Sequence, residues 1–172
     1  MKQTADYPLG PELDFLRRLW RLNHALERVS SRMEERLGVT AQQRLIVRCV
    51  GKYPGLTAGQ LAGLLHLDPG TVSASLRRLG QRGLVERRPD PRDRRRVTLG
   101  LTEEGRRVDQ PSVGTVEAAT QALLKRVPSA ELSSTAQVIE QLADLLEAVP
   151  EEPPAKARSG RRRPRPRSRA EA

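Results

Sequence analysis

The tripeptide Pro89-Asp90-Pro91 places the strongest single constraint on how this chain folds. Proline fixes its own φ angle and has no N–H to donate, so we expect two prolines around an aspartate to form a loop. Apolar residues stand on both sides of that loop: Leu84 and Val85 before it, and Val97, Leu99 and Leu101, which alternate with Arg96, Thr98 and Gly100, after it. This alternation is typical of a half-buried strand. The pattern therefore predicts a two-stranded hairpin with the segment RRPDPRDRR, residues 87–95, as its loop.

Three helix starts precede the hairpin. Thr40 with Gln43, and Thr57 with Gln60, each have the spacing of a capping box. Asp68 followed by Pro69 is a third start, with an N-cap residue before a proline in the first turn, and it predicts a helix over 69–82. Three helices followed by a hairpin predict a mainly α fold with a winged helix-turn-helix core at residues 40–101 and a two-stranded β-wing.

Helical patterns flank this core on both sides. Residues 12–37 carry an apolar stripe, which serves either as a subunit interface or as ordinary core: Leu16, Leu19, Leu26, Val29, Met33 and Leu37. A further helix begins at Thr102, Pro111 and Gly114 kink or break it, and a last amphipathic helix covers 132–149. Residues 1–11 form an N-terminal arm. Residues 150–172 lack the apolar side chains that packing needs and are expected to be a disordered Arg/Pro-rich basic tail.

The distribution of charge indicates a polyanionic partner. The net charge of the chain is +10. Residues 77–96 contain nine arginines and three acidic residues, a net charge of +6, and residues 156–172 have a net charge of +7. Aromatic residues make up only 2% of the chain, which argues against a stacking platform for single-stranded nucleic acid. Double-stranded DNA is the partner that this pattern favours.

The predicted helix over 69–82 has an outward face that suits a DNA major groove. Its candidate DNA-binding residues are Gly70, Thr71, Ser73, Ala74, Arg77 and Arg78. Small side chains at the leading end allow a close approach to base edges, the N–H groups at the helix N-terminus suit a phosphate, and arginines further along bind phosphate or guanine.

The candidate residues of the wing are Arg88, Arg92, Asp93, Arg94 and Arg95, which we expect to reach a minor groove. Asp93 is placed to hold either the Arg95 side chain or the hairpin backbone in position. Asp90 is expected to shape the turn through its own side-chain hydrogen bonds.

The motifs GLVERR, DPRDRR and LTEEG, at the spacing found here, resemble the MarR family of bacterial transcriptional regulators. The resemblance covers residues 12–149 and is densest over 40–107. It implies a homodimer in which the helices at 12–37 and 102–149 form the interface, bound to a pseudo-palindromic operator. It further implies a repressor that a small aromatic ligand relieves.

The same resemblance places Thr71 and Ser73 at base-contact positions and Arg78 at a phosphate contact. Asp93 and Arg95 fall on the Asp-x-Arg of the wing tip, whose arginine enters the minor groove. Many members of the family carry a base-reading arginine where this chain has Ala74. Either Arg77 replaces that arginine, or Ala74 meets a thymine methyl group.

Two other functions compete with a sequence-specific regulator. The first is a non-specific architectural DNA-binding protein that relies on the wing and the basic tail, and the second is a protein-interaction module with the winged fold. The tail either adds phosphate contacts or is a low-complexity extension with little role, because arginine, alanine and proline are abundant throughout the chain.

Other chemistry finds little support in the sequence. Cys49 is the single cysteine; it is either a redox-sensing thiol or an inert thiol on an apolar helix face. His24 and His66 do not have the spacing of a metal-ligand set. We expect no cofactor and no enzymatic activity, since no catalytic motif is present. A single cysteine and the lack of a signal peptide or membrane span predict a cytoplasmic, nucleoid-associated protein.

Overall fold

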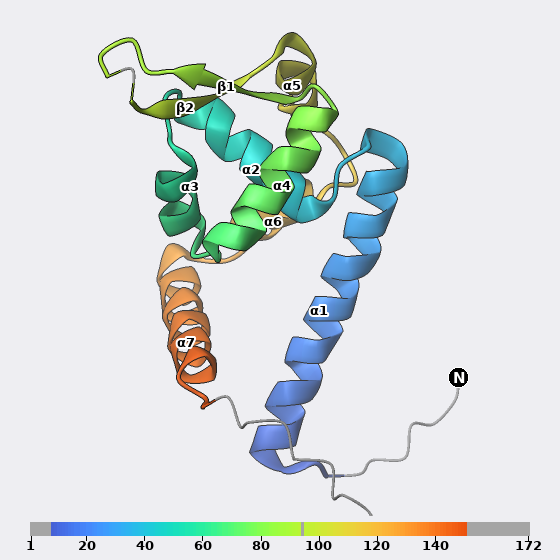
Figure 1. Ribbon diagram of the computed structural model, residues 1–172. Helices are drawn as coiled ribbons and strands as arrows, with labels where there is room; N and C mark the ends of the chain where they lie inside the picture. The colour runs from blue at the N-terminus through green and yellow to red at the C-terminus, as the bar shows by residue number, and fades with distance from the viewer. Residues whose placement is uncertain (1–7, 94, 151–172) are drawn as a thin grey trace, which may run out of the picture. The chain divides into compact units, whose positions relative to one another are not determined.

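The computed structural model describes residues 8–93 and 95–150 (Figure 1). The chain divides into two units, Met1–Arg126 and Val127–Ala172. The first unit contains helices α1 to α6 and the hairpin, and the second contains helix α7. Most of the predicted arm 1–11, nearly all of the predicted tail 150–172, and Arg94 lie outside the described residues.

Helix α1 covers Gly10–Leu37 and so begins two residues earlier than predicted. It ends at Gly38, whose φ of 70° is left-handed and whose N–H donates to the Glu34 carbonyl. Met33 is the one fully buried residue in this helix, all of which is described. Most of the predicted stripe is therefore not core within this chain, and the alternative of a subunit interface remains.

Helices α2 (Ala41–Lys52), α3 (Ala58–Leu65) and α4 (Pro69–Gln81) begin where their capping residues predict. Both capping boxes form, with Thr40 and Thr57 as the N-caps. Asp68 accepts hydrogen bonds from the N–H groups of Gly70 and Thr71. Caps of this kind stabilise a protein by about 1 kcal/mol each, so the three starts are set by local chemistry.

Strands β1 (Val85–Pro89) and β2 (Val97–Leu101) form the antiparallel hairpin, with Val85 opposite Leu101 and Pro89 opposite Val97. The prediction that Pro89 belongs to the loop, together with Arg87 and Arg88, is wrong. Pro89 is tolerated because it is the last residue of a strand that pairs on one side, where no ladder N–H is needed. The other edge of β2 is also held, because the N–H of Leu99 donates to the Leu56 carbonyl at 2.8 Å.

The alternation of β2 matches the prediction except near the loop. Leu99 and Leu101 are buried, whereas Val97 is 48% exposed. Thr98 is buried although it is one of the residues that alternate with the apolar ones, and its hydroxyl donates to the Arg88 carbonyl. The hairpin thus enters the core at its base and leaves it toward the tip.

The core is aliphatic, as the composition requires. It joins the inner faces of α2, α3 and α4 to the base of the hairpin: Val39, Ile46, Val47, Val50, Leu61, Ala62, Val72, Leu76, Leu79, Leu84, Val85, Leu99 and Leu101. Figure 1 shows the hairpin at one end of this unit, next to α4 and α5. The position of the wing is therefore fixed to the helix that precedes it.

Helix α5 (Glu103–Val108) begins at the N-cap Thr102, as predicted. The helix then breaks: α6 covers Val116–Leu124, and Gly114 in between has a left-handed φ of 69°. We call residues 109–115 the linker. In the second unit, α7 covers Ser129–Glu147. It begins three residues before the predicted start at 132 and ends two residues before the predicted end at 149.

Gly105 lies where α5 meets the turn before the hairpin. A Cβ atom at this position would overlap the carbonyl oxygen of Leu84. The backbone carbonyls of Gly83 and Leu84 also accept hydrogen bonds from the Thr102 hydroxyl. The base of the wing and the start of α5 are thus joined by backbone packing that only glycine permits.

We predict that Gly105→Ala destabilises the protein by about 1–3 kcal/mol, because backbone must move to admit the methyl group. Urea unfolding followed by circular dichroism measures this. Gly63→Ala is the matched control, since nothing lies within 4 Å of a Cβ built there; alanine in that helix should stabilise by about 0.5–1 kcal/mol. Equal effects of the two substitutions would contradict the close packing at Gly105.

Candidate nucleic-acid interface

Helix α4 presents the outward face that its sequence predicts. Val72, Leu76 and Leu79 are buried against the core. Of the residues assigned to DNA, Ala74 is half-buried and five are exposed: Gly70, Thr71, Ser73, Arg77 and Arg78. Small side chains occupy the first two turns and arginines the third. The outward face of the helix is therefore formed by small residues near its N-terminus and by cationic residues further along.

The N-terminus of α4 differs from the expectation of a phosphate site. One oxygen of Asp68 accepts from the N–H of Gly70 at 2.7 Å and from that of Thr71 at 3.1 Å. A phosphate would have to displace this carboxylate and overcome its like charge. The cap therefore uses the N–H groups that the prediction assigned to an anion.

The wing loop is organised by its two aspartates. Asp90 accepts from the N–H of Arg92 at 2.8 Å, and Asp93 accepts from the N–H of Arg95 at 3.0 Å. The backbone of Arg96 closes the loop. Its carbonyl accepts from the N–H of Asp90, and its N–H donates to the backbone carbonyl of Asp93, both at 2.9 Å. Of the two roles considered for Asp93, the structure contains the one in which it holds the backbone. Arg92 and Arg95 remain exposed, and Arg94 lies outside the described residues.

Arg88 and its neighbour Arg87 lie on opposite faces of β1. Arg88 forms an ion pair with Glu86 and covers Gly100, with its Nε atom 3.5 Å from where a Cβ would lie. Arg87 instead lines a hollow beside α4 together with Gly70, Ser73, Ala74 and Arg77. The sequence predicted a DNA contact for Arg88, which stays a proposal, and Arg87 was not among the predicted residues. Strand alternation places Arg87 on the same side as Val85, but the sequence alone does not show that this side packs against α4.

Cys49 is partly buried, on the face of α2 that packs against the core. Burial raises the pKa of its thiol, and the positive charge of Lys52 opposes this effect only in part. A thiol with a raised pKa contains less of the reactive thiolate at neutral pH. The environment therefore favours the inert alternative over redox sensing.

A buried arginine holds the linker to α2. The side chain of Arg44 is only 2% exposed, and its Nε atom donates to Glu117 at 2.8 Å. The same guanidinium donates to the carbonyls of Val108 and Gln110, which the end of α5 leaves without helical partners. No local pattern in the sequence predicts this role for Arg44, because its partners are more than 60 positions away.

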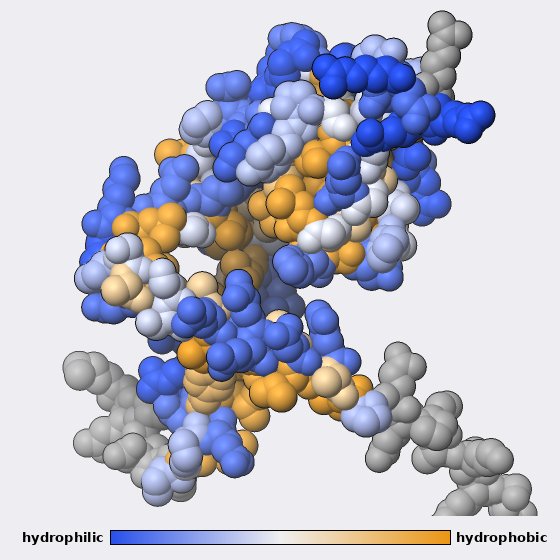
Figure 2. All heavy atoms as spheres, turned by 90° about the vertical axis from the view of Figure 1, so that its left-hand side faces the viewer, coloured by the Kyte–Doolittle hydropathy of each residue, from blue (hydrophilic) through white to orange (hydrophobic). Residues whose placement is uncertain are grey.

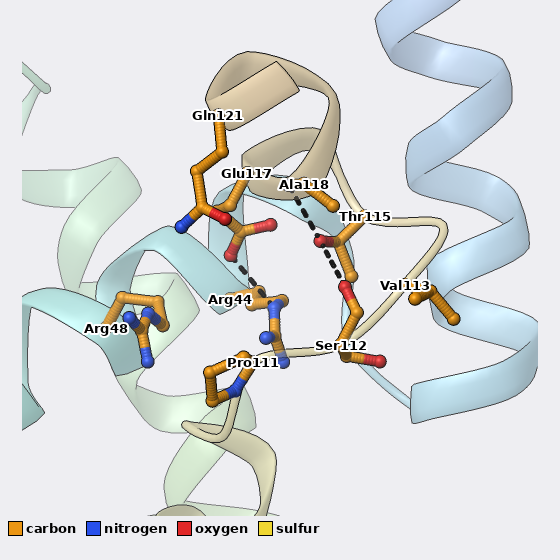
Figure 3. A pocket seen from close by; sticks show the side chains of 9 residues that line it. All are labelled: Arg44, Arg48, Pro111, Ser112, Val113, Thr115, Glu117, Ala118 and Gln121. Atoms are coloured by element: carbon orange, nitrogen blue, oxygen red, sulfur yellow. Dashed lines mark hydrogen bonds and ion pairs between the residues drawn. The ribbon is translucent and has the colours of Figure 1, made fainter. Parts of the chain in front are cut away.

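A pocket of about 220 Å³ lies beside Arg44 (Figure 3). Apolar atoms of Pro111, Val113 and Ala118 form part of its wall. Its polar lining is formed by Arg44, Arg48, Ser112, Thr115, Glu117 and Gln121. Arg48 also pairs with Asp109 at 2.8 Å, and among the described residues none donates a hydrogen bond to the buried second oxygen of Glu117. The lining thus has two cationic groups and one anionic group, around a cavity the size of a small molecule.

Across 8–93 and 95–150, no group of three or more His, Cys, Asp and Glu side chains is placed to hold a metal ion. None of the helices in these ranges has both the length and the apolarity required to cross a membrane.

Three helices followed by a β-hairpin that packs against the third define a winged helix-turn-helix protein. The family model described as the MarR family matches residues 39–97. The multiple antibiotic resistance protein MarR of Salmonella typhimurium is 32% identical over 113 residues, which are 61% of this chain and 72% of that protein. The chain belongs to the MarR family.

Two further proteins illustrate the range of the likeness. The organic hydroperoxide resistance transcriptional regulator of Bacillus subtilis is 32% identical over 79 residues; the match covers 46% of this chain and about half, 54%, of that regulator. The crystal structure of the transcriptional regulator PcaV from Streptomyces coelicolor, in complex with its natural ligand, has a TM-score of 0.60. It is 27% identical, and the alignment covers 84% of this chain and 99% of PcaV.

We predict that Cys49 in the folded protein is alkylated by iodoacetamide more slowly at neutral pH than in the urea-unfolded chain. Because the folded pKa is raised, the pH-rate profile of the folded protein should be displaced to higher pH. The measurement is clean because the chain has one cysteine. A folded profile at or below the unfolded one would contradict an inert thiol and support redox sensing.

Proposed function

We propose that this protein is a homodimeric, sequence-specific DNA-binding repressor of transcription. The observation that carries the proposal is the pairing of two surfaces: the outward face of α4 and the arginine-bearing loop of the wing. Both surfaces keep arginines exposed, and the carboxylates of Asp68, Asp90 and Asp93 accept hydrogen bonds from backbone N–H groups. These aspartates build the interface and leave Arg77, Arg92 and Arg95 available to DNA.

The mode of binding follows from the shapes of the two elements. A helix fits the major groove, and small residues at its leading end, such as Ser73 and Ala74, permit close approach to base edges. An extended loop fits the narrower minor groove, where negative potential attracts an arginine. We assign the minor-groove contact to Arg95, whose backbone Asp93 holds. Arg92 and Arg94 belong to the same proposed contact.

The dimer is proposed from exposed apolar surface. Helix α1 exposes large side chains along its length, among them Trp20 at 61%. Helix α7 exposes Val138, Ile139, Leu145 and Leu146, and hydrophobic side chains are visible on the face shown in Figure 2. Apolar surface of this extent marks a protein interface. A two-fold dimer would present two α4 helices to the half-sites of a pseudo-palindrome.

The alternative, a non-specific architectural DNA-binding protein, differs in one measurable quantity. A regulator should prefer its own site over random DNA by about a thousandfold or more. An architectural protein should bind both alike, with affinity that falls steeply with salt. The small side chains at the leading end of α4, which permit close approach to base edges, favour the regulator.

The test is fluorescence anisotropy with DNA that flanks the protein's own gene, titrated beside a scrambled duplex at two salt concentrations. Strong preference for the flanking DNA, retained after truncation at Pro150, supports the regulator. Equal affinity for both duplexes prompts selection from a random library. If that library also gives no preferred sequence, the specific function is wrong and the architectural alternative replaces it.

We predict that Arg95→Ala reduces affinity for the preferred site by about 1–3 kcal/mol, because a minor-groove contact is lost. The matched control is Arg107→Ala, which removes the same charge from α5, where Arg107 pairs with Glu104. The control should bind nearly as the wild type does. Equal losses in the two variants would mean that total charge, and not the wing contact, sets the affinity.

We also propose that the pocket beside the linker binds a small aromatic carboxylate that relieves repression. Its lining has the guanidinium groups of Arg44 and Arg48 and apolar walls from Pro111, Val113 and Ala118, and its volume of about 220 Å³ suits a single ring. Arg44 is buried and paired with Glu117, so a ligand carboxylate would compete with Asp109 for the more exposed Arg48. It lies between the winged core and α6, so an occupant would contact both. PcaV has the same fold and was solved with its natural ligand bound, which is consistent with this proposal.

We predict that benzoate raises the melting temperature of the protein and weakens its binding to DNA, whereas the neutral analogue benzamide does neither. Arg48→Ala should abolish the effect of benzoate, because Arg48 is the more exposed of the two cationic groups in the lining. Arg107→Ala serves again as the charge control. Equal responses to benzoate and benzamide, or none to either, would rule out a carboxylate site here.

A further inference from the structure

We infer that Arg87 and Arg77 together hold one backbone phosphate of the DNA strand that passes between α4 and the wing. The inference rests on the proposed DNA binding. It adds a contact from the inner face of β1, which neither the sequence motifs nor the comparisons assign. The occupant of the hollow is a phosphodiester group and not a base edge.

Small residues and two arginines line the hollow. Gly70, Ser73 and Ala74 contribute to it from the first two turns of α4. Arg77 stands on the same helix one turn further on, and Arg87 approaches from β1. The hollow has a volume of about 490 Å³, so a bulky anion can enter.

The register of the hairpin explains why Arg87 faces α4. Arg87 is paired with Leu99, and Val85 with Leu101. Paired residues in an antiparallel ladder point to the same side of the sheet. Val85, Leu99 and Leu101 are buried in the core on this side, whereas Arg87 lies beyond the edge of the core and is exposed. Its side chain therefore emerges next to the exposed face of α4.

Charge also distinguishes Arg87 from its neighbour. Within the part of the chain that the structure describes, neither Arg87 nor Arg77 forms an ion pair with a carboxylate, whereas Arg88 is paired with Glu86. An arginine without a carboxylate partner can give both prongs of its fork to a phosphate. Arg87 and Arg77 are thus available for an anion, and Arg88 is already engaged.

The geometry of duplex DNA supplies the occupant. Adjacent major and minor grooves are separated by one sugar-phosphate backbone. A protein that places a helix in one groove and a neighbouring loop in the other must straddle that backbone at the surface between the two elements. In this protein that surface is the hollow between α4 and β1. Phosphate contacts fix the register of a protein on DNA without reading sequence, which is the role that follows for this pair.

The experiment compares Arg87→Ala with Arg107→Ala in the full chain, on a duplex that the wild type selects from a random library and on a scrambled duplex. Affinity is measured over a salt series. Arg87→Ala should weaken binding to both duplexes by a similar factor, about tenfold, and should lower the slope of log K against log salt by about one. Arg107→Ala, which removes the same charge from α5, should leave the slope unchanged, and Arg87→Lys should restore it because the charge returns.

A methylphosphonate scan then locates the contact. A neutral methylphosphonate is placed at one phosphate at a time in the selected duplex. At one position per half-site the wild type should lose affinity, whereas Arg87→Ala should lose nothing further. Circular dichroism melting confirms that each variant is folded.

Three results overturn the inference. If Arg87→Ala weakens only the selected duplex and leaves the salt slope intact, Arg87 reads a base, while the DNA-binding function stands. If Arg107→Ala lowers the slope as much as Arg87→Ala does, total charge and not the hollow sets the affinity. If the wild type binds no duplex at any salt concentration, the proposed function itself fails and the phosphate contact fails with it.

Discussion

The buried guanidinium of Arg44 is the interaction on which the rest of the first unit depends. A helix that breaks after Val108 leaves carbonyl groups without partners inside the protein, and each such group costs free energy. Arg44 satisfies two of them and pairs with Glu117 across the linker. Arg48 and Arg36 donate to two more linker carbonyls, those of Asp109 and Val113. Three arginines from α1 and α2 thus replace the hydrogen bonds that a continuous helix would have made, and they fix where α6 begins.

The features that could be predicted from the sequence are those that depend on neighbours within a few residues. The N-caps at Thr40, Thr57, Asp68 and Thr102 all form, because each bonds to an N–H group two or three residues away. The aspartates of the wing bond over the same short range. The inward face of α4 follows from the helical period. Local chemistry was therefore sufficient for the order of the elements and for most of the candidate interface.

What could not be predicted depends on tertiary structure. Pro89 belongs to strand β1 and not to the loop, because β1 pairs with β2 on one side only and a proline is tolerated there. No local pattern shows how many partners a strand will have. Arg44 looks like any charged residue of an amphipathic helix until the linker returns to cover it. Arg87 is one residue from Arg88 in sequence, yet the two lie on opposite faces of the hairpin. Choosing between them requires knowing which face packs against α4.

The wing loop separates the residues that hold its shape from the residues that face outward. Asp90 and Asp93 fix the backbone through their own neighbours' N–H groups, and any residue except proline can supply such a group. The side chains at positions 92 and 95 are therefore free to change during evolution without unfolding the loop. Descendants of this protein could acquire new preferences in DNA shape by single substitutions at the tip, at almost no cost in stability. A change at either aspartate would instead alter the loop for every arginine at once.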